Sequence, residues 1–159
     1  MSISIGSKAP DFTLKNSEGK EITLSSFNGS KNVLVLFFPL AFTGVCTAEL
    51  CSTRDSLADY NSMNAEVLAI SVDSHFTLKH FKEANKLNFD LLSDFNKKAS
   101  TAYGSLYNDF FGMTGVAKRS AFVVDKNGVV KYAEVLEAAK DLPNFSAITN
   151  PEIWIVAFT

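Results

Sequence analysis

Residues 33–46 read Val33-Leu34-Val35-Leu36-Phe37-Phe38-Pro39-Leu40-Ala41-Phe42-Thr43-Gly44-Val45-Cys46. The first six residues are all apolar, which is typical of a central strand covered on both faces. Pro39 ends this strand because proline has no N–H to donate to a sheet. After a short turn, residues 46–60 contain neither Gly nor Pro and space their apolar residues like a helix. The stretch therefore predicts a strand, a tight turn and a helix that begins at Cys46.

The preceding and following segments extend this alternation of strands and helices. Residues 12–14 and 22–24 alternate in polarity around a polar break, which predicts a surface hairpin. Residues 67–72 form a second apolar run, and Asp73 and Ser74 are suited to cap the helix expected after it. Strand, helix, strand and helix thus follow one another.

The second half of the chain predicts a sheet edge and a closing helix. A short strand is expected at residues 89–92, and a short helix at residues 97–103 before a glycine. Residues 121–125 and 129–134 flank an Asn-Gly pair, which favours a hairpin because both residues tolerate positive φ. A last helix is expected from about Glu137.

These elements predict an α/β protein with a thioredoxin-like fold, in which helices flank a central mixed sheet and a β-hairpin stands at the N-terminus. The 159 residues show neither repeats nor linkers. Two domains would average only about 80 residues each. We therefore expect one domain over residues 1–159.

The charge and composition of the chain exclude some classes of function. With 15 Lys+Arg against 17 Asp+Glu, the net charge of -2 gives no field for binding nucleic acid or a membrane surface. No apolar run approaches the roughly 18 residues of a membrane span, and the first residues lack the pattern of a signal peptide. A cytoplasmic protein is expected.

Cys46 is the candidate nucleophile. A helix N-terminus presents free N–H groups and partial positive charge, which stabilise a thiolate. Thr43 either caps the helix or directs its hydroxyl into the same pocket. The alternative is a cysteine that only packs, since free cysteine is among the most buried residue types.

The spacing of Pro39, Thr43 and Cys46 resembles the signature of the peroxiredoxins, thiol peroxidases with a thioredoxin-like fold. The resemblance extends over roughly residues 5 to 146. Around Pro39 to Cys46, the sequence is most similar to the alkyl hydroperoxide reductase E branch. Its second cysteine, Cys51, resembles that of the bacterioferritin comigratory protein branch.

The resemblance implies a role for each residue of the motif. Cys46 would attack the peroxide and become a sulfenic acid, Arg119 would hold the thiolate and polarise the peroxide, and Thr43 with the backbone N–H groups would add donors. Pro39 would shield Cys46, and Glu49 would orient the arginine. The alternatives are a solvated surface arginine and an ordinary first-turn carboxylate. The resemblance implies neither a metal nor an organic cofactor.

Cys51 resembles a resolving cysteine, which would form a disulfide with Cys46 that thioredoxin or a similar dithiol reduces. In an intact helix, however, Cα atoms five residues apart lie about 8.6 Å from each other, whereas a disulfide tolerates roughly 7 Å. Pairing therefore requires part of the helix to unwind. The alternatives are resolution by an external thiol, with Cys51 only packing, and a non-enzymatic redox-sensing or holdase module.

Three further stretches of the sequence have more than one interpretation. A zinc site of both cysteines with His75 and His80 has unsuitable spacing. Residues 107–113 are either a loop with buried anchors, or an apolar wall of the peroxide pocket or a contact of a homodimer. Asn150-Pro151 should break the last helix, and the apolar residues 153–158 would then add a strand, cover an apolar patch or form an exposed terminus.

Overall fold

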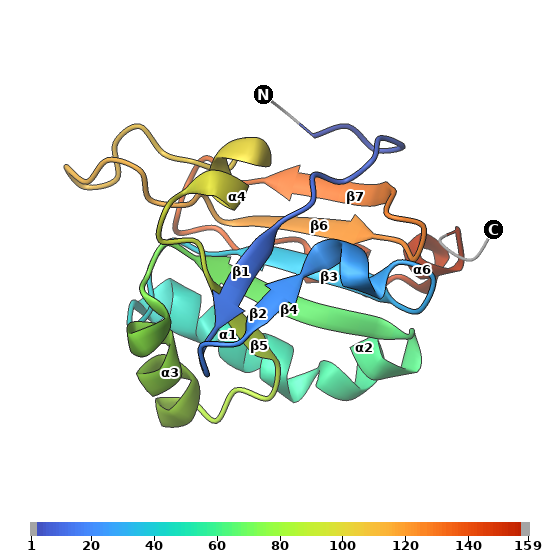
Figure 1. Ribbon diagram of the computed structural model, residues 1–159, viewed down its shortest axis with the longest axis horizontal. Helices are drawn as coiled ribbons and strands as arrows, with labels where there is room; N and C mark the ends of the chain where they lie inside the picture. Colours follow the sequence, from blue (N-terminus) through green and yellow to red (C-terminus); the bar gives the residue numbers. More distant parts are fainter. Residues whose placement is uncertain (1–2, 157–159) are drawn as a thin grey trace.

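Strand β3 (Asn32–Phe37), the apolar run of the sequence, lies inside a seven-stranded mixed sheet (Figure 1). The computed structural model describes residues 3–156. The strand order is β2-β1-β5-β4-β3-β6-β7, and all six residues of β3 are buried. The remaining strands are β1 (Thr13–Asn16), β2 (Glu21–Thr23), β4 (Ala65–Ser71), β5 (Asp90–Ser93), β6 (Ser120–Val124) and β7 (Val130–Val135).

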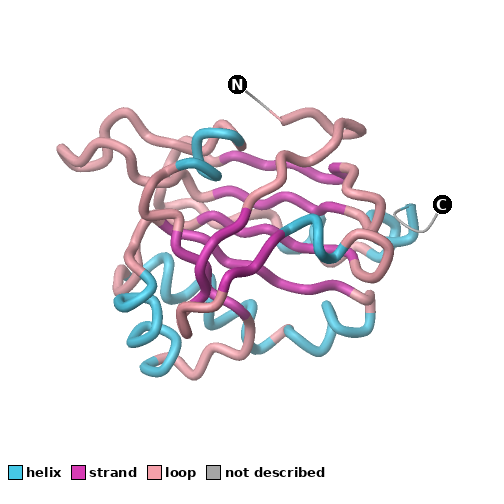
Figure 2. The backbone as a smooth tube through the Cα atoms, in the orientation of Figure 1, coloured by secondary structure: helices cyan, strands magenta, loops and turns pink. Residues whose placement is uncertain are grey.

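The helices follow the strands along the chain and lie outside the sheet (Figure 2). Their bounds are η1 (Leu24–Phe27, a 3-10 turn), α1 (Gly44–Asp55), α2 (Leu57–Ser62), α3 (His75–Ala84), α4 (Lys98–Ala102), α5 (Phe145–Ile148) and α6 (Pro151–Val156). Strands β3, β4 and β5 are parallel neighbours, and the helices between them are the crossover connections that parallel strands require. The expected thioredoxin-like fold with its N-terminal hairpin is confirmed.

Alternating residues of the central strands supply two apolar layers, one on each face of the sheet. Leu34 and Leu36 of β3 pack with α1, α2 and α3 in one cluster. Val35 and Phe37 face the opposite way and pack with α4 and the N-terminal segment. This division follows from the two-residue period of a strand.

The antiparallel pairing of β3 with β6 brings two distant parts of the chain together. Phe37, near the end of β3, pairs with Ser120, the first residue of β6. The loop that leads to α1 and the residue that precedes β6 therefore emerge at the same end of the sheet. Cys46, in the first turn of α1, and Arg119 therefore lie at this end of the sheet.

The helix expected over residues 46–60 is interrupted. Helix α1 already begins at Gly44 and ends at Asp55, and α2 follows after Ser56. Ser56 has φ -101° and ψ 10°, which departs from the α-helical values. Sequence periodicity alone does not show such a break, because the apolar positions continue on the same face.

The helix expected from about Glu137 is wrong. Residues 137–144 form turns and loop, and α5 begins only at Phe145. The cap sets this start: the Asn144 side chain accepts a hydrogen bond from the N–H of Ala147.

The expected break at Asn150-Pro151 is confirmed: α5 ends at Ile148, and a separate helix, α6, starts at Pro151. Pro151 is the first residue of α6, where its missing N–H costs nothing, and Asn150 Oδ1 accepts from the N–H of Glu152. Residues 153–156 are therefore helical, and the alternative of an added strand is wrong for them. Trp154 covers the apolar cluster beneath α1 to α3. The last residues of the tail, 157–159, lie outside the described part.

Among the described residues 3–156, no helix combines the length and the apolar character needed to cross a membrane.

Trp154 should contribute strongly to stability, because its side chain is 1% exposed and its indole N–H donates to the carbonyl of Ile148 at 2.7 Å. We expect Trp154→Ala to lower the free energy of unfolding by about 3–5 kcal/mol, measured by urea denaturation. Phe76→Ala is the control, since Phe76 is 70% exposed, and it should change stability by less than about 0.5 kcal/mol. Equal effects of the two substitutions would contradict the packing of α6 described above.

Candidate active site

Cys46 lies in the first turn of α1 and is 1% exposed. The loop between β3 and α1 is held by Asp73, whose Oδ2 accepts from the N–H of Ala41 at 2.8 Å and from the hydroxyl of Ser71 at 2.6 Å. Phe42 turns the chain with φ 64°, and its ring packs edge-on against that of Phe81. The loop thus carries the chain into the helix with Cys46 directed inward.

The guanidinium of Arg119 lies beside the sulfur of Cys46. Nη1 donates to Cys46 Sγ at 3.3 Å although the residues are 73 apart in sequence. Nε and Nη2 both donate to the backbone carbonyl of Ala139, at 3.2 Å and 2.8 Å. Arg119 is 1% exposed, which excludes the alternative of a solvated surface arginine. The pKa of Arg119 lies above its usual value: burial works against the charge, but Glu49 and Cys46 favour it more strongly.

Glu49 forms a buried ion pair with the same arginine. Its Oε1 accepts from Arg119 Nη1 at 2.6 Å, and the residue is fully buried. Its other oxygen, Oε2, has no hydrogen-bond partner among the described residues. Burial raises the pKa of Glu49 to about 7, and the positive charge of Arg119 only partly opposes this rise. Glu49 is therefore not an ordinary exposed first-turn carboxylate.

A pocket of about 410 Å³ opens onto Cys46 and Arg119. Pro39 and Thr43 line it, as do three apolar residues of the 107–113 loop: Phe110, Phe111 and Met113. The three loop residues form an apolar wall of the pocket, which is one of the structures expected for residues 107–113. The pocket can admit a small molecule to the sulfur while presenting little polar surface elsewhere.

Thr43 occupies the N-cap position of α1 but does not cap with its side chain. Its hydroxyl donates to the carbonyl of Leu40 at 2.7 Å, and its backbone carbonyl accepts from the N–H of Thr47. The oxygen lone pairs of this hydroxyl remain available at the pocket. The N–H groups of Val45 and Cys46 belong to the first helical turn, where no intrahelical acceptor exists.

Cys51 does not line this pocket. It lies in the same intact helix α1, is half-buried, and its Sγ is 3.8 Å from Oδ1 of Asn85 at the end of α3. Both cysteines are free. Five residues rotate a side chain by about 500° around a helix, so Cys51 faces away from Cys46.

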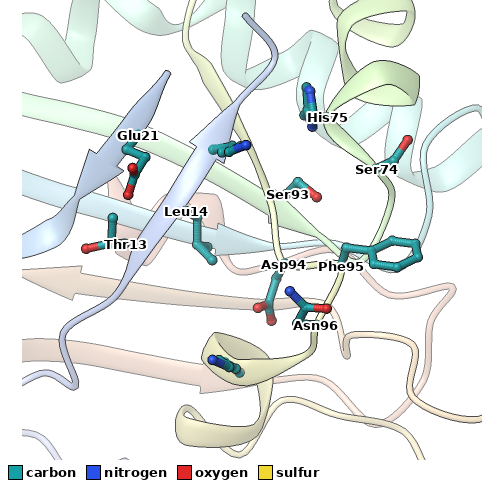
Figure 3. Close-up of a pocket in the computed structure, with 11 residues that line it drawn as sticks. Thr13, Leu14, Glu21, Ser74, His75, Ser93, Asp94, Phe95 and Asn96 are labelled. Atoms are coloured by element: carbon teal, nitrogen blue, oxygen red, sulfur yellow. The ribbon is translucent and has the colours of Figure 1, made fainter. Parts of the chain in front are cut away.

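A second pocket, of about 520 Å³, lies across β1, the end of β5 and the start of α3 (Figure 3). Among its lining residues are His75, Ser93 and Asp94, and it shares no residue with the Cys46 pocket. It holds no cysteine. Although it is the larger of the two, it offers no thiol for redox chemistry.

Two groups at the site were not anticipated from the sequence. Asp73, expected as a helix cap, instead holds the Cys46 loop, while Ser74 caps α3 by accepting from the N–H of Thr77. The carbonyl of Ala139 is a backbone group, so no residue type signals it. The position of Asp73 directly after a buried strand was the available clue, since such positions meet at one edge of the sheet.

Comparison with known proteins identifies the family. Residues 5–133 match the family model described as "AhpC/TSA family". The chain is 42% identical over 135 residues to alkyl hydroperoxide reductase E of Mycobacterium tuberculosis, covering 84% of this chain and 86% of that protein. It is also 42% identical over 130 residues to the chloroplastic peroxiredoxin Q of rice, Oryza sativa subsp. japonica, covering 82% of this chain and 58% of that protein.

Solved structures agree with this relationship. The reduced 2-Cys peroxiredoxin of Plasmodium vivax superposes with a TM-score of 0.86 at 29% identity, covering 98% of this chain and 83% of the other. The chain therefore belongs to the AhpC/TSA family. It is a peroxiredoxin, a thiol peroxidase that uses a peroxide substrate and a thiol reductant. Family membership thus favours an enzyme over the non-enzymatic alternative.

The raised pKa of Glu49 predicts a pH dependence of stability. The Glu49 carboxyl binds its proton more tightly in the folded protein, where its pKa is about 7, than in the unfolded chain, where its pKa is near 4.5. This tighter proton binding stabilises the fold fully below pH 4.5, and the contribution is lost as the pH rises through about 7. We expect the free energy of unfolding, measured with urea at pH 5 and pH 8, to fall less with rising pH in Glu49→Gln than in the wild type. Identical pH profiles for the two proteins would contradict the assigned pKa.

Proposed function

We propose that this protein reduces hydrogen peroxide and organic hydroperoxides with Cys46 as the nucleophile. The observation that carries the proposal is the 3.3 Å contact between Arg119 Nη1 and Cys46 Sγ within an apolar pocket. A fixed cation beside a sulfur at a helix N-terminus is suited to hold that sulfur as a thiolate.

The first step transfers one oxygen atom to Cys46. The thiolate attacks the terminal peroxide oxygen, the O–O bond breaks, and the remaining alkoxide or hydroxide leaves as alcohol or water with the proton that Cys46 released. The sulfur is oxidised to a sulfenic acid and the peroxide is reduced. Negative charge develops on the departing oxygen, so donors that are already in place lower the barrier.

Four residues would support this step. Arg119 directs N–H groups at the sulfur and at the peroxide, and Thr43 with the first-turn N–H groups orients the bound oxygen. Pro39, which is buried beside Cys46 and has no N–H, would limit access and over-oxidation. Glu49 would hold the guanidinium in position through the 2.6 Å ion pair.

Cys51 would resolve the sulfenic acid. Its thiolate attacks Cys46 Sγ, the S–O bond breaks, the S–S bond forms, and hydroxide leaves as water with the proton that Cys51 released. Thioredoxin or a similar dithiol would then reduce the disulfide. A cycle that a dithiol completes requires a reducing compartment, for which the cytosol is proposed.

Exposed apolar side chains beside the pocket would support self-association of the protein. Phe111 is 87% exposed and Met113 is 42% exposed. Large apolar side chains so exposed at one loop favour contact with another protein surface, for which a second copy of the chain is the proposed partner.

Intact mass after one equivalent of hydrogen peroxide tests the two cysteine roles. We expect the loss of two hydrogens and of both alkylatable thiols, without a covalent dimer. Cys46→Ser should show no change and no peroxidase activity, whereas Cys51→Ser should gain one oxygen. If the wild type gained one oxygen with Cys51 still alkylatable, an external thiol would be the resolving agent.

Arg119→Lys tests the guanidinium. Lysine keeps the charge but cannot reproduce the planar set of donors that reaches Cys46, Glu49 and Ala139 together. We expect the second-order rate constant for Cys46 oxidation to fall at least about tenfold, as measured by stopped-flow competition. Lys118→Ala is the matched control, because Lys118 pairs with Glu137 and does not line the pocket. An unchanged rate in Arg119→Lys would remove Arg119 from the site.

A further inference from the structure

The guanidinium of Arg119 depends on an acceptor in an irregular segment of the chain. Its Nε and Nη2 both donate to the backbone carbonyl of Ala139, at 3.2 Å and 2.8 Å. Ala139 lies within residues 137–144, which form turns and loop. A carbonyl in such a segment is fixed only as well as the segment itself. The contacts that hold this segment therefore influence where the guanidinium lies.

The two ends of the segment are bonded to neighbouring strands. Before it, the N–H of Leu136 donates to the carbonyl of Arg119 at 2.9 Å. At its end, the N–H of Asn144 donates to Oε1 of Glu134 at 2.8 Å. Ala139 lies between these two points, so its carbonyl needs a further restraint.

An arm formed by residues 106–117 supplies such a restraint. It projects from the body of the protein (Figure 1), and two isolated bridges join its two sides. Near its base, the N–H of Tyr107 donates to the carbonyl of Val116 at 2.8 Å, and the carbonyl of Tyr107 accepts from the N–H of Gly115 at 3.1 Å. The backbone of Tyr107 is therefore held in place by the arm.

The side chain of Tyr107 joins the arm to the segment that carries Ala139. Its hydroxyl donates to the backbone carbonyl of Glu137, two residues before Ala139, at 3.1 Å. Its ring stacks on that of Phe110, with centroids 5.3 Å apart and the planes 28° from parallel. Because the stack already restrains the ring, the hydroxyl loses little further freedom when it bonds to the segment.

The hydroxyl of Tyr107 also keeps its proton. Burial raises the pKa of Tyr107 above its usual value. The positive charge of Arg119 acts in the opposite direction, and the negative charges of Glu137 and Cys46 add to the rise. Tyr107 is therefore a donor throughout the neutral pH range.

The side chain of Glu137 makes a second link, an ion pair with Lys118 at 2.8 Å. This carboxylate is 80% exposed, and exposed ion pairs contribute little because water screens them. The bond from Tyr107 reaches the backbone of Glu137 instead, so it restrains the chain itself.

We propose that Tyr107 is a positioning residue for the peroxide site. Its hydroxyl fixes the segment that carries the Ala139 carbonyl, and this carbonyl orients the guanidinium toward Cys46. Tyr107 does not line the pocket, so it acts on the reaction through Arg119. The inference rests on the proposed function, because it extends the part that Arg119 takes in peroxide reduction.

Tyr107→Phe tests the inference, because it removes the hydroxyl and keeps the stacked ring. All proteins compared carry Cys51→Ser, so that Cys46 is the one thiol that reacts. We expect the second-order rate constant for oxidation of Cys46 by hydrogen peroxide to fall about three- to fivefold, as measured by stopped-flow competition. The pH profile of Cys46 alkylation should move to higher pH, because a guanidinium that is less well held stabilises the thiolate less.

Two variants are matched controls. Tyr132→Phe removes a hydroxyl of β7 that makes a hydrogen bond of the same length, 3.1 Å, to Glu134 Oε1 outside the pocket. Glu137→Ala removes the carboxylate that pairs with Lys118 but leaves the backbone carbonyl that Tyr107 bonds. Both variants should keep the rate constant and the pH profile of the parent protein.

Proton exchange at the Nε–H of Arg119 reports the position of the guanidinium directly. The chain has two arginines, Arg54 and Arg119, so Arg54→Lys assigns the two Nε–H signals in a nitrogen-edited NMR spectrum. The Arg119 signal should exchange slowly, because this group is buried and bonded to the carbonyl of Ala139. Exchange should become about three- to fivefold faster in Tyr107→Phe and stay unchanged in Tyr132→Phe.

The inference requires both the exchange of Arg119 and the chemistry of Cys46 to respond. If exchange speeds up while the rate constant and the pH profile stay the same, Tyr107 holds the segment without affecting the site, and the inference is overturned. A slower reaction with unchanged exchange would overturn it as well, because Tyr107 would then act by another route. Equal effects of Tyr107→Phe and Tyr132→Phe would show only that the loss of any such hydroxyl is harmful.

Failure of the proposed function gives a different result. In that case Cys46 of the parent protein would react with peroxide no faster than a free thiol. The alkylation profile and the Nε–H exchange use no peroxide, so both would still respond to Tyr107→Phe if Tyr107 positions Arg119.

Discussion

The guanidinium of Arg119 is the group on which the site depends. Three acceptors share its donors: Cys46 Sγ, Glu49 Oε1 and the carbonyl of Ala139. A cation that is 1% exposed is stable only when such partners are in place. The partners come from α1 and from the loop after β7, so the site forms only when both have docked against the sheet. The same contacts that stabilise the buried charge therefore fix the reactive sulfur.

The pairing of strands in the sheet sets the position of Arg119 relative to its partners. Pairing of Phe37 with Ser120 sets where Arg119 leaves β6, and the N–H of Leu136 after β7 donates to the carbonyl of Arg119 at 2.9 Å. A slip of one residue in this pairing would turn every side chain of β6 to the opposite face. The buried alternation of β3 and β6 prevents such a slip, because each face packs into its own apolar cluster.

The sequence predicted correctly those elements whose formation depends on neighbouring residues. The apolar run before Pro39, the Asn-Gly hairpin and the cap at Ser74 each depend on residues close in sequence. The break at Ser56 was missed because apolar spacing continues across it. The start at Phe145 was missed although Asn144, which caps α5, is a local signal. At the site, the position of Cys46 at a helix start indicated the nucleophile, and only the resemblance to the peroxiredoxins indicated Arg119. The carbonyl of Ala139 and the role of Asp73 arise from the fold. No residue type signals the Ala139 carbonyl, and the clue to Asp73 was its position after a buried strand.

The burial of Trp154 has an optical consequence. It is the single tryptophan of the chain, and it lies in the same apolar cluster as Cys46 and Leu50 of α1. Indole emission depends on the polarity and mobility of its surroundings. The protein therefore carries an intrinsic fluorophore inside the layer that packs beneath its reactive helix. A change of packing in that layer can be observed in unlabelled protein during turnover, with every cysteine left free for its chemistry.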